Sequence, residues 1–144
     1  MSSTWRIGPE VALAQLEATI ARADAGSGRC RVRLHTTDRP SSISGAVGGT
    51  PQAEIVLAKP CASIVGGALV WHAEDAGGAL VMVAGIPRWA VWIGASGIVV
   101  AEGSVTDADH GGDFRVLGGT TPDGEQSPLL LAGGLVVLAA SALT

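Results

Sequence analysis

The side chains in this sequence that could carry acid–base or nucleophilic chemistry are three histidines and the serines around them. His35, His72 and His110 fall in three separate stretches of the chain. The Gly-x-Ser-x-Gly pattern of serine hydrolases does not occur, and residues 94–97 lack its spacing. We therefore do not expect a Ser–His–Asp triad, and a small hydrolase domain is the least favoured function class.

An acidic loop at residues 107–113 offers the oxygen donors that calcium prefers. An EF-hand loop needs ligands at its fifth and twelfth positions, which here are Gly111 and Gly118. The loop therefore fails the motif. We expect an acidic turn between two strands, with a weaker oxygen-ligand site as the alternative.

Cys30 and Cys61 are the two cysteines of the chain. They form no Cys-x-x-Cys pair, and no Cys/His spacing fits zinc. Both stand in apolar patterns, so we expect buried free thiols. A disulfide between them is geometrically open but has no support in the sequence.

Four tryptophans are the main aromatic residues. Trp5 precedes a helical pattern and is expected to anchor the N-terminus to a partner or to the sheet. Trp89 and Trp92 are three residues apart, so in a strand they face opposite sides. We expect one in the core and the other on a surface or interface, and Trp71 has the same two alternatives. An exposed tryptophan would suit sugar stacking, but subunit contact or core packing is the favoured interpretation.

The elements that must position these residues begin with a helix. Pro9 stands at a favoured first helical position, and Leu13, Leu16 and Ile20 recur along one side. A helix over residues 9–25 is predicted. A lone helix of this length is marginal in water, so its apolar stripe must lie on a sheet or on another subunit.

Apolar and polar residues then alternate over residues 29–36, which predicts a half-buried strand. One face carries Cys30, Val32 and Leu34, and the other carries Arg29, Arg31, Arg33 and His35. The arginine face is expected either to pair with acidic side chains of a neighbouring strand or subunit, or to be solvated.

The rest of the chain alternates short apolar runs with turn signals. A strand is expected over residues 53–59, stopped by Pro60, and further short strands follow to the C-terminus. Residues 37–52 form the longest loop, which is either an arm that reaches a neighbour or an ordinary surface loop. Twelve of the 21 glycines form Gly-Gly pairs between or within the runs.

Short strands with regular turn signals are typical of sandwiches and barrels. We therefore predict a mainly β protein, an antiparallel, jelly-roll-like β-sandwich with one N-terminal α-helix. Residues 1–28 are the N-terminal helical segment, and residues 29–144 are the sandwich, a single globular unit.

Composition excludes several function classes. The chain has 144 residues, nine Lys and Arg against 13 Asp and Glu, and a net charge of -4. A hydrophobic fraction of 47% argues against disorder, and the acidic balance argues against a nucleic-acid partner. The longest apolar runs fall short of the roughly 20 residues of a membrane span. The N-terminus shows no secretory h-region, so a chain made without export is expected.

Five motifs follow one another along the chain: a strand ending in Pro, a Pro-x-Ala element, a Gly-Gly pair, a Trp/Ser-Gly hairpin and an Ala-Gly strand. They fall at residues 32–40, 57–62, 66–67, 89–105 and 131–138. Taken in this order, the segments resemble a family of small virion proteins of tailed bacteriophages. The first strand lacks the family's Tyr, and the hairpin lacks the Arg after Trp89.

The resemblance implies a non-enzymatic structural protein of the virion: a head decoration or cement protein, a collar protein or a tail component. Its partners would be copies of itself, in a trimer or ring, and other virion proteins such as major capsid or tail proteins. It would reside in the virion after synthesis in the host bacterial cytoplasm, with no nucleic-acid or membrane partner. We assign no catalytic, cofactor-binding or metal-binding residue and no cofactor. The alternative is a carbohydrate- or receptor-binding module of a tail fibre.

Overall fold

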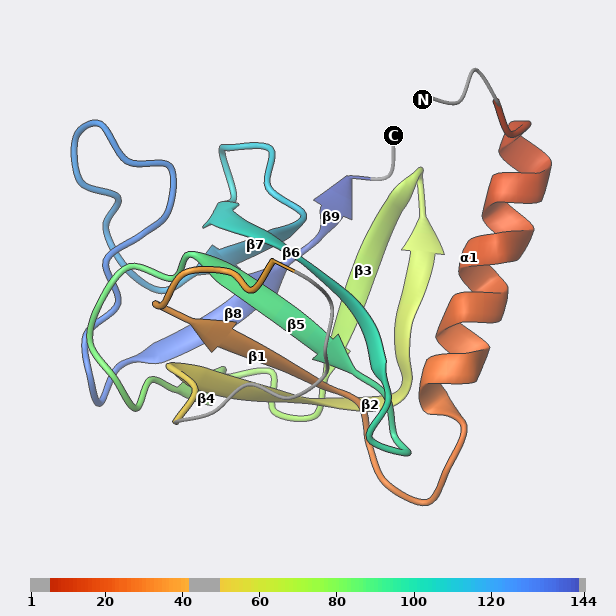
Figure 1. The fold of residues 1–144 in the computed structure, drawn as a ribbon, viewed down its shortest axis with the longest axis horizontal. Coiled ribbons are helices and arrows are strands. Elements are labelled where there is room, and N and C mark those ends of the chain that lie inside the picture. Colours follow the sequence, from red (N-terminus) through yellow and green to blue (C-terminus); the bar gives the residue numbers. More distant parts are fainter. Residues whose placement is uncertain (1–5, 42–49, 143–144) are drawn as a thin grey trace.

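The computed structural model of the protein describes residues 6–41 and 50–142, and it shows a curled β-sheet with a helix at its side (Figure 1). The elements are α1 (Pro9–Asp24), β1 (Arg31–His35), β2 (Ala53–Val65), β3 (Ala68–Ala73), β4 (Ala79–Leu80), β5 (Trp89–Ile93), β6 (Val99–Asp107), β7 (Phe114–Leu117), β8 (Leu135–Ala139) and β9 (Ser141–Ala142). The mainly β character and the N-terminal helix are confirmed. The expected boundary at residue 28 lies between α1 and β1. Trp5 and residues 42–49 of the long loop lie outside the described residues.

Within the described residues, nine strands belong to one sheet in the order β4-β8-β7-β6-β5-β1-β2-β3-β9. Neighbouring strands are antiparallel except β6 and β7, which run parallel. The expectation of a wholly antiparallel sheet was therefore wrong at this pair. The jelly-roll-like sandwich is not confirmed by this strand pairing.

The parallel pair follows from a tight return of the chain after β6. The backbone N–H of Gly112 donates to Thr106 Oγ1 at 3.0 Å, which holds the loop flat against β6. A Cβ at Gly112 would stand only 2.7 Å from the Thr106 side chain, so the approach depends on glycine. The next strand therefore starts beside β6 and runs in the same direction.

Strand β1 has the predicted alternation as far as Leu34, but the expectation that His35 lies on the polar arginine face was wrong, because His35 is buried against Trp89. The strand lies between β2 and β5, and Cys30, Val32 and Leu34 are fully buried on its inner side. Strand β2 differs from the prediction, because Pro60 does not stop it. The pairing of β2 with β3 shifts register between Leu57 and Ala62, which accommodates a residue that has no N–H to donate.

The segments around residues 79–85 and 127–132, both expected as strands, are mostly irregular. Only Ala79–Leu80 forms β4, and Leu129 and Leu130 make isolated bridges to Thr120 and Gly85. Their backbone groups instead bond to loops, as in the Met82 N–H to the Gln52 carbonyl at 2.7 Å. Both segments are rich in apolar residues, and this composition alone does not distinguish such loops from strands.

The curl of the sheet encloses the core. Trp71 of β3 stacks on Phe114 of β7 at a centroid distance of 5.7 Å, and it meets Trp92 of β5 edge-on at 5.0 Å. Strand β4 is the first strand of the sheet order, yet the N–H of Met82, just after β4, donates to the carbonyl of Gln52, just before β2. The described part of the sheet is thus rolled toward closure rather than split into two layers.

Helix α1 stands beside the β2–β3 hairpin (Figure 1). Pro9 occupies its first turn as predicted, and its C-terminal end is fixed to the sheet by the Ala95 N–H, which donates to the Ala23 carbonyl at 2.7 Å. Only Ile20 and Ala23 of this helix are buried. The apolar stripe is therefore covered at one end and exposed toward Leu13.

Candidate functional site

The acidic loop at residues 107–113 is a self-contained turn. Asp107 Oδ1 accepts from the His110 ring Nδ1 at 2.6 Å, and Oδ2 accepts from the Thr121 hydroxyl at 2.6 Å. The Thr121 hydrogen bond, followed by that of His110, lowers the pKa of Asp107 to about 2. Asp113, at the end of the loop, accepts instead from the Ser104 backbone N–H at 3.1 Å. These carboxylates serve the protein's own donors, as expected of an acidic turn.

The three histidines have separate surroundings and share no hydrogen bond in the described structure. His35 is buried and stacked on Trp89 with ring centroids 4.6 Å apart. Burial, with a smaller contribution from the Arg33 charge, lowers the pKa of His35. A buried histidine in this position is a packing residue.

Sequence reasoning missed one hydrogen-bonded pair that resembles a nucleophile and its base. The His72 ring Nε2 lies 3.0 Å from Ser63 Oγ, and its Nδ1 lies 2.9 Å from the Pro60 carbonyl oxygen. No carboxylate among the described residues bonds to His72, so a backbone carbonyl alone orients the ring. The cross-strand spacing of β2 and β3 produces this pair, and no sequence motif marks it.

The tryptophans pack inside the protein. Trp89 and Trp92 face opposite sides of β5, yet both are buried, so the expectation that one of them lies at a surface or interface was wrong. Trp92 belongs to the core that the curled sheet encloses, whereas Trp89 is buried on the other face of β5, where its ring stacks on His35. Trp71 is half-buried against Trp92 and Phe114. Core packing, part of the favoured interpretation, is confirmed for Trp92 and for Trp71, which packs against the same core.

The arginine face pairs with acidic side chains of the same chain. Arg31 and Arg33 reach the two carboxylate oxygens of Glu54 on β2 at 3.2 and 2.8 Å. Arg29 lies 3.8 Å from Glu74. These partly exposed pairs each contribute little to stability, and they leave this face mixed in charge.

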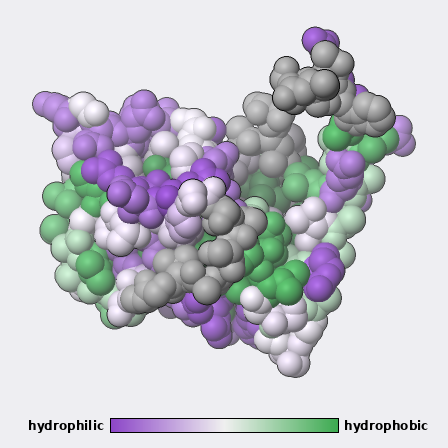
Figure 2. Space-filling model, viewed as in Figure 1, coloured by the Kyte–Doolittle hydropathy of each residue, from purple (hydrophilic) through white to green (hydrophobic). Residues whose placement is uncertain are grey.

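A cluster of exposed apolar side chains lies where β4 meets β8. Leu80 of β4 is paired directly with Leu135 of β8, and the two side chains are 57% and 52% exposed. Met82 and Leu131 are also exposed, and hydrogen bonds between residues 81 and 133–134 hold their segments together. We call Leu80, Met82, Leu131 and Leu135 the leucine patch. Figure 2 shows apolar surface at the left edge of the molecule, where this end of the sheet lies.

A second apolar region lies between α1 and the β2–β3 hairpin. It is a groove of about 650 Å³, lined on the helix by Leu13 and Ile20 and on the hairpin by Ala62 and Ile64. Leu13 remains exposed on its rim. The groove shows that the helix around Leu13 does not pack tightly against the β2–β3 hairpin.

A polar cleft of about 570 Å³ lies beside β6, between residues 104–106 of that strand and the loops at residues 87–88, 111–112 and 124–127. Arg88 and Glu125 form an ion pair of 2.9 Å at its wall. Ser104, Thr106, Gln126 and Ser127 add further polar groups to the lining. The cleft has the groups to hold a small polar ligand but no aromatic ring for stacking among the residues that line it.

Cys30 and Cys61 are both buried and form no disulfide, which confirms the predicted free thiols. Among the residues that the structure describes, no helix has the length and apolar character to cross a membrane. Comparisons of the chain with protein-family models, with curated proteins and with solved structures gave no match.

Proposed function

We propose that the chain is a non-enzymatic structural subunit that works by assembling with copies of itself and with neighbouring proteins. The leucine patch is the observation that carries this proposal. Large apolar side chains gathered on one surface mark an interaction site more often than scattered ones do. Leu80 and Leu135 stand opposite each other, so one partner surface would cover both.

The core supports the same function, because it is complete without the patch. Trp89, Trp92, Phe114 and the inner side of β1 are buried within the chain. The leucines of the patch are therefore surface residues in excess of what folding requires. Closed symmetric homo-oligomers are the commonest assemblies, and a trimer or a ring would cover the patch in every subunit.

We further propose that this subunit belongs to a phage virion, as a head decoration or cement protein, a collar protein or a tail component. The support is the ordered resemblance of its motifs to small virion proteins of tailed bacteriophages. Its neighbours would then be major capsid or tail proteins. The virion would be its final location, after synthesis in the host bacterial cytoplasm.

Sedimentation of the purified chain over a range of concentrations tests the proposal. We expect a mass that is a multiple of the 14.4 kDa chain, and we expect the protein to co-sediment with phage particles. A strict monomer that stays in the supernatant when particles are pelleted would overturn it.

The alternative, a carbohydrate- or receptor-binding module of a tail fibre, has one observation in its favour. The polar cleft beside Arg88 and Glu125 would suit hydroxyl-rich ligands. Trp89 and Trp92 are buried, and Trp71 is half-buried against Trp92 and Phe114, so these three rings do not form the exposed stacking platform that such modules use. Glycan-array binding that is lost in Arg88→Ala would favour the alternative over assembly.

A further inference from the structure

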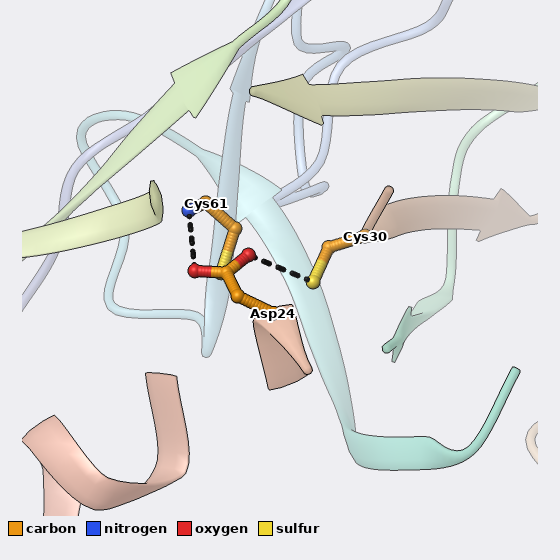
Figure 3. A group of neighbouring side chains, drawn as sticks. All are labelled: Asp24, Cys30 and Cys61. Carbon is orange, nitrogen blue, oxygen red and sulfur yellow. Dashed lines mark hydrogen bonds between the residues drawn. The ribbon is translucent and has the colours of Figure 1, made fainter. Parts of the chain in front are cut away.

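One carboxylate and two thiols from separate elements meet at the C-terminal end of α1 (Figure 3). Asp24 is the last helical residue, Cys30 comes just before β1, and Cys61 lies in β2. One ligand atom from each residue lies within 4.8 Å of the other two. The two cysteines are fully buried, and Asp24 is partly exposed.

The Asp24 carboxylate lies between the two cysteines (Figure 3). Its Oδ1 accepts the Cys30 S–H at 3.5 Å, and its Oδ2 accepts the Cys61 backbone N–H at 3.0 Å. The Cys30 S–H also approaches the Ala23 carbonyl oxygen at 3.1 Å. The backbone hydrogen bond fixes the carboxylate, so the two sulfurs and the Oδ1 atom are held in a small group.

The spacing of these atoms is close to that of a tetrahedral metal site. Zn–S bonds of about 2.3 Å and Zn–O bonds of about 2.1 Å place neighbouring ligand atoms roughly 3.5–3.8 Å apart. The Cys30 sulfur and Asp24 Oδ1 already stand at 3.5 Å. All three ligand atoms lie within 4.8 Å of one another, so only a small inward shift separates them from this spacing.

Trp92 supplies a second, independent observation. Its ring N–H is buried and has no hydrogen-bond partner among the described residues. Strand pairing places Trp92 opposite Val32, on the face of the sheet that Cys30 shares. The Trp92 side chain lies next to the Cys30 sulfur. An unpaired donor beside a sulfur is the kind of outer contact that supports a metal-bound thiolate.

We propose that Asp24, Cys30 and Cys61 bind one Zn²⁺ ion, with water in the fourth position. Zinc takes thiolate and carboxylate ligands in tetrahedral geometry, and three protein ligands leave one position open. Binding forms two Zn–S bonds and one Zn–O bond to the carboxylate, while one water of the hydrated ion stays bound and its other waters leave. The two S–H bonds break, two protons go to solvent, and no atom changes its oxidation state.

The ion would fasten α1 to the sheet. The helix contributes Asp24, and β2 and the residue before β1 contribute the two cysteines. A bound ion therefore adds to the connection already made by buried Ile20 and Ala23 and by the hydrogen bonds at the helix end. We therefore expect zinc to raise the melting temperature and to slow hydrogen exchange in the last turn of α1.

A disulfide between Cys30 and Cys61 is the competing interpretation of the same thiols. A disulfide would make no use of the Asp24 carboxylate and would leave the Trp92 N–H beside a neutral sulfur. The mixed ligand set therefore favours a cation over a sulfur–sulfur bond.

The test is titration of the reduced, metal-free full chain with Co²⁺ as a spectroscopic probe, followed by displacement with Zn²⁺. We expect one Co²⁺ per chain, near-ultraviolet absorption from thiolate-to-cobalt charge transfer, intense visible bands of tetrahedral cobalt, and release of two protons per ion. Asp24→Asn and Cys61→Ser should each weaken binding at least tenfold, and Trp92→Phe should weaken it about 10- to 100-fold. Asp113→Asn is the matched control, because its carboxylate bonds to Ser104 instead.

Circular dichroism shows whether each variant is folded. Asp24→Asn is the decisive variant if a cysteine variant unfolds, because it preserves the size of the side chain. The absence of stoichiometric binding in the folded wild-type chain would overturn the proposal. So would unchanged Co²⁺ binding in folded Asp24→Asn, or a mass loss of two hydrogens that shows a disulfide in the chain as isolated under mild conditions.

Discussion

Replacement of Leu80 and Leu135 by alanine tests whether the leucine patch drives assembly. Complete burial of a leucine side chain is worth about 1.5–3 kcal/mol. The two side chains are 57% and 52% exposed in the single chain, so about half of that burial is left for a partner to supply. Together, the two leucines should therefore stabilise an interface that buries one copy of the patch by roughly 1.5–3 kcal/mol.

A free-energy loss of this size corresponds to a roughly 10- to 100-fold weaker association, since about 1.4 kcal/mol is tenfold in Kd. Sedimentation equilibrium on the wild-type chain and on the Leu80→Ala/Leu135→Ala variant measures the change directly. Val65→Ala is the control, because Val65 is similarly exposed but lies at the β2–β3 turn. An equal Kd for the wild type and the double variant, with both folded, would refute the argument that the patch is an interface.

Three further predictions concern the stability of the subunit. Burial, with a smaller contribution from Arg33, lowers the pKa of His35 in the folded chain below its ordinary value of 6.5. As the pH falls, the unfolded chain therefore binds the proton before the folded chain does. The free energy of unfolding should then decrease from about pH 6.5 down to the pKa of His35 in the folded chain. Urea unfolding at several pH values should show this loss in the wild type and a flatter profile in His35→Phe, which keeps a ring to stack on Trp89; identical profiles would contradict it. The lowered pKa of Asp107 means that its contribution to stability is present above pH 3.8 and is lost as the pH falls toward 2. Asp107→Asn should therefore unfold at a higher pH than the wild type in an acid titration followed by circular dichroism. An unchanged midpoint would count against the Thr121 and His110 contacts. Trp71→Ala should cost about 3 kcal/mol in urea unfolding and Trp71→Phe clearly less, because only the second variant keeps a ring against Phe114; equal losses would show that stacking is not the cause.

Local sequence patterns predicted the helix and the strand whose structure depends mainly on residues close by in the sequence. Pro9 and the apolar spacing after it predicted α1 to within one residue of its end, and the alternation around Val32 predicted β1 and its buried face. These features depend on backbone periods that a short window contains.

The features that the sequence did not predict depend on partners far along the chain. Pro60 looks like a strand end, but the register shift against β3 lets β2 continue through it. Gly112 looks like an ordinary turn, but its contact with Thr106 directs β7 parallel to β6. Alternation on β5 placed Trp89 and Trp92 on opposite faces, but it did not show that the curled core covers Trp92 or that Trp89 is buried against His35 on the other face.

The cluster at the end of α1 was missed for a similar reason. Metal motifs in sequences are recognised by short spacings, and Cys30 and Cys61 are 31 residues apart with Asp24 in a different element. Hydrogen bonding places Cys30 beside Leu57 of β2, the irregular stretch of β2 between Leu57 and Ala62 then places Cys61 near Cys30, and docking of the helix adds the carboxylate. The leucine patch was likewise hidden, because exposed and buried leucines have the same appearance in an apolar run.

Hydrogen exchange across a dilution series is the measurement that tests the central claim most directly, since it reports which backbone segments a partner covers. The account predicts that residues 79–83 and 129–136 are protected at high protein concentration and exchange faster on dilution, while the core strand β1 is unchanged. Concentration-independent exchange at the leucine patch, in a chain that sediments at 14.4 kDa throughout, would contradict it.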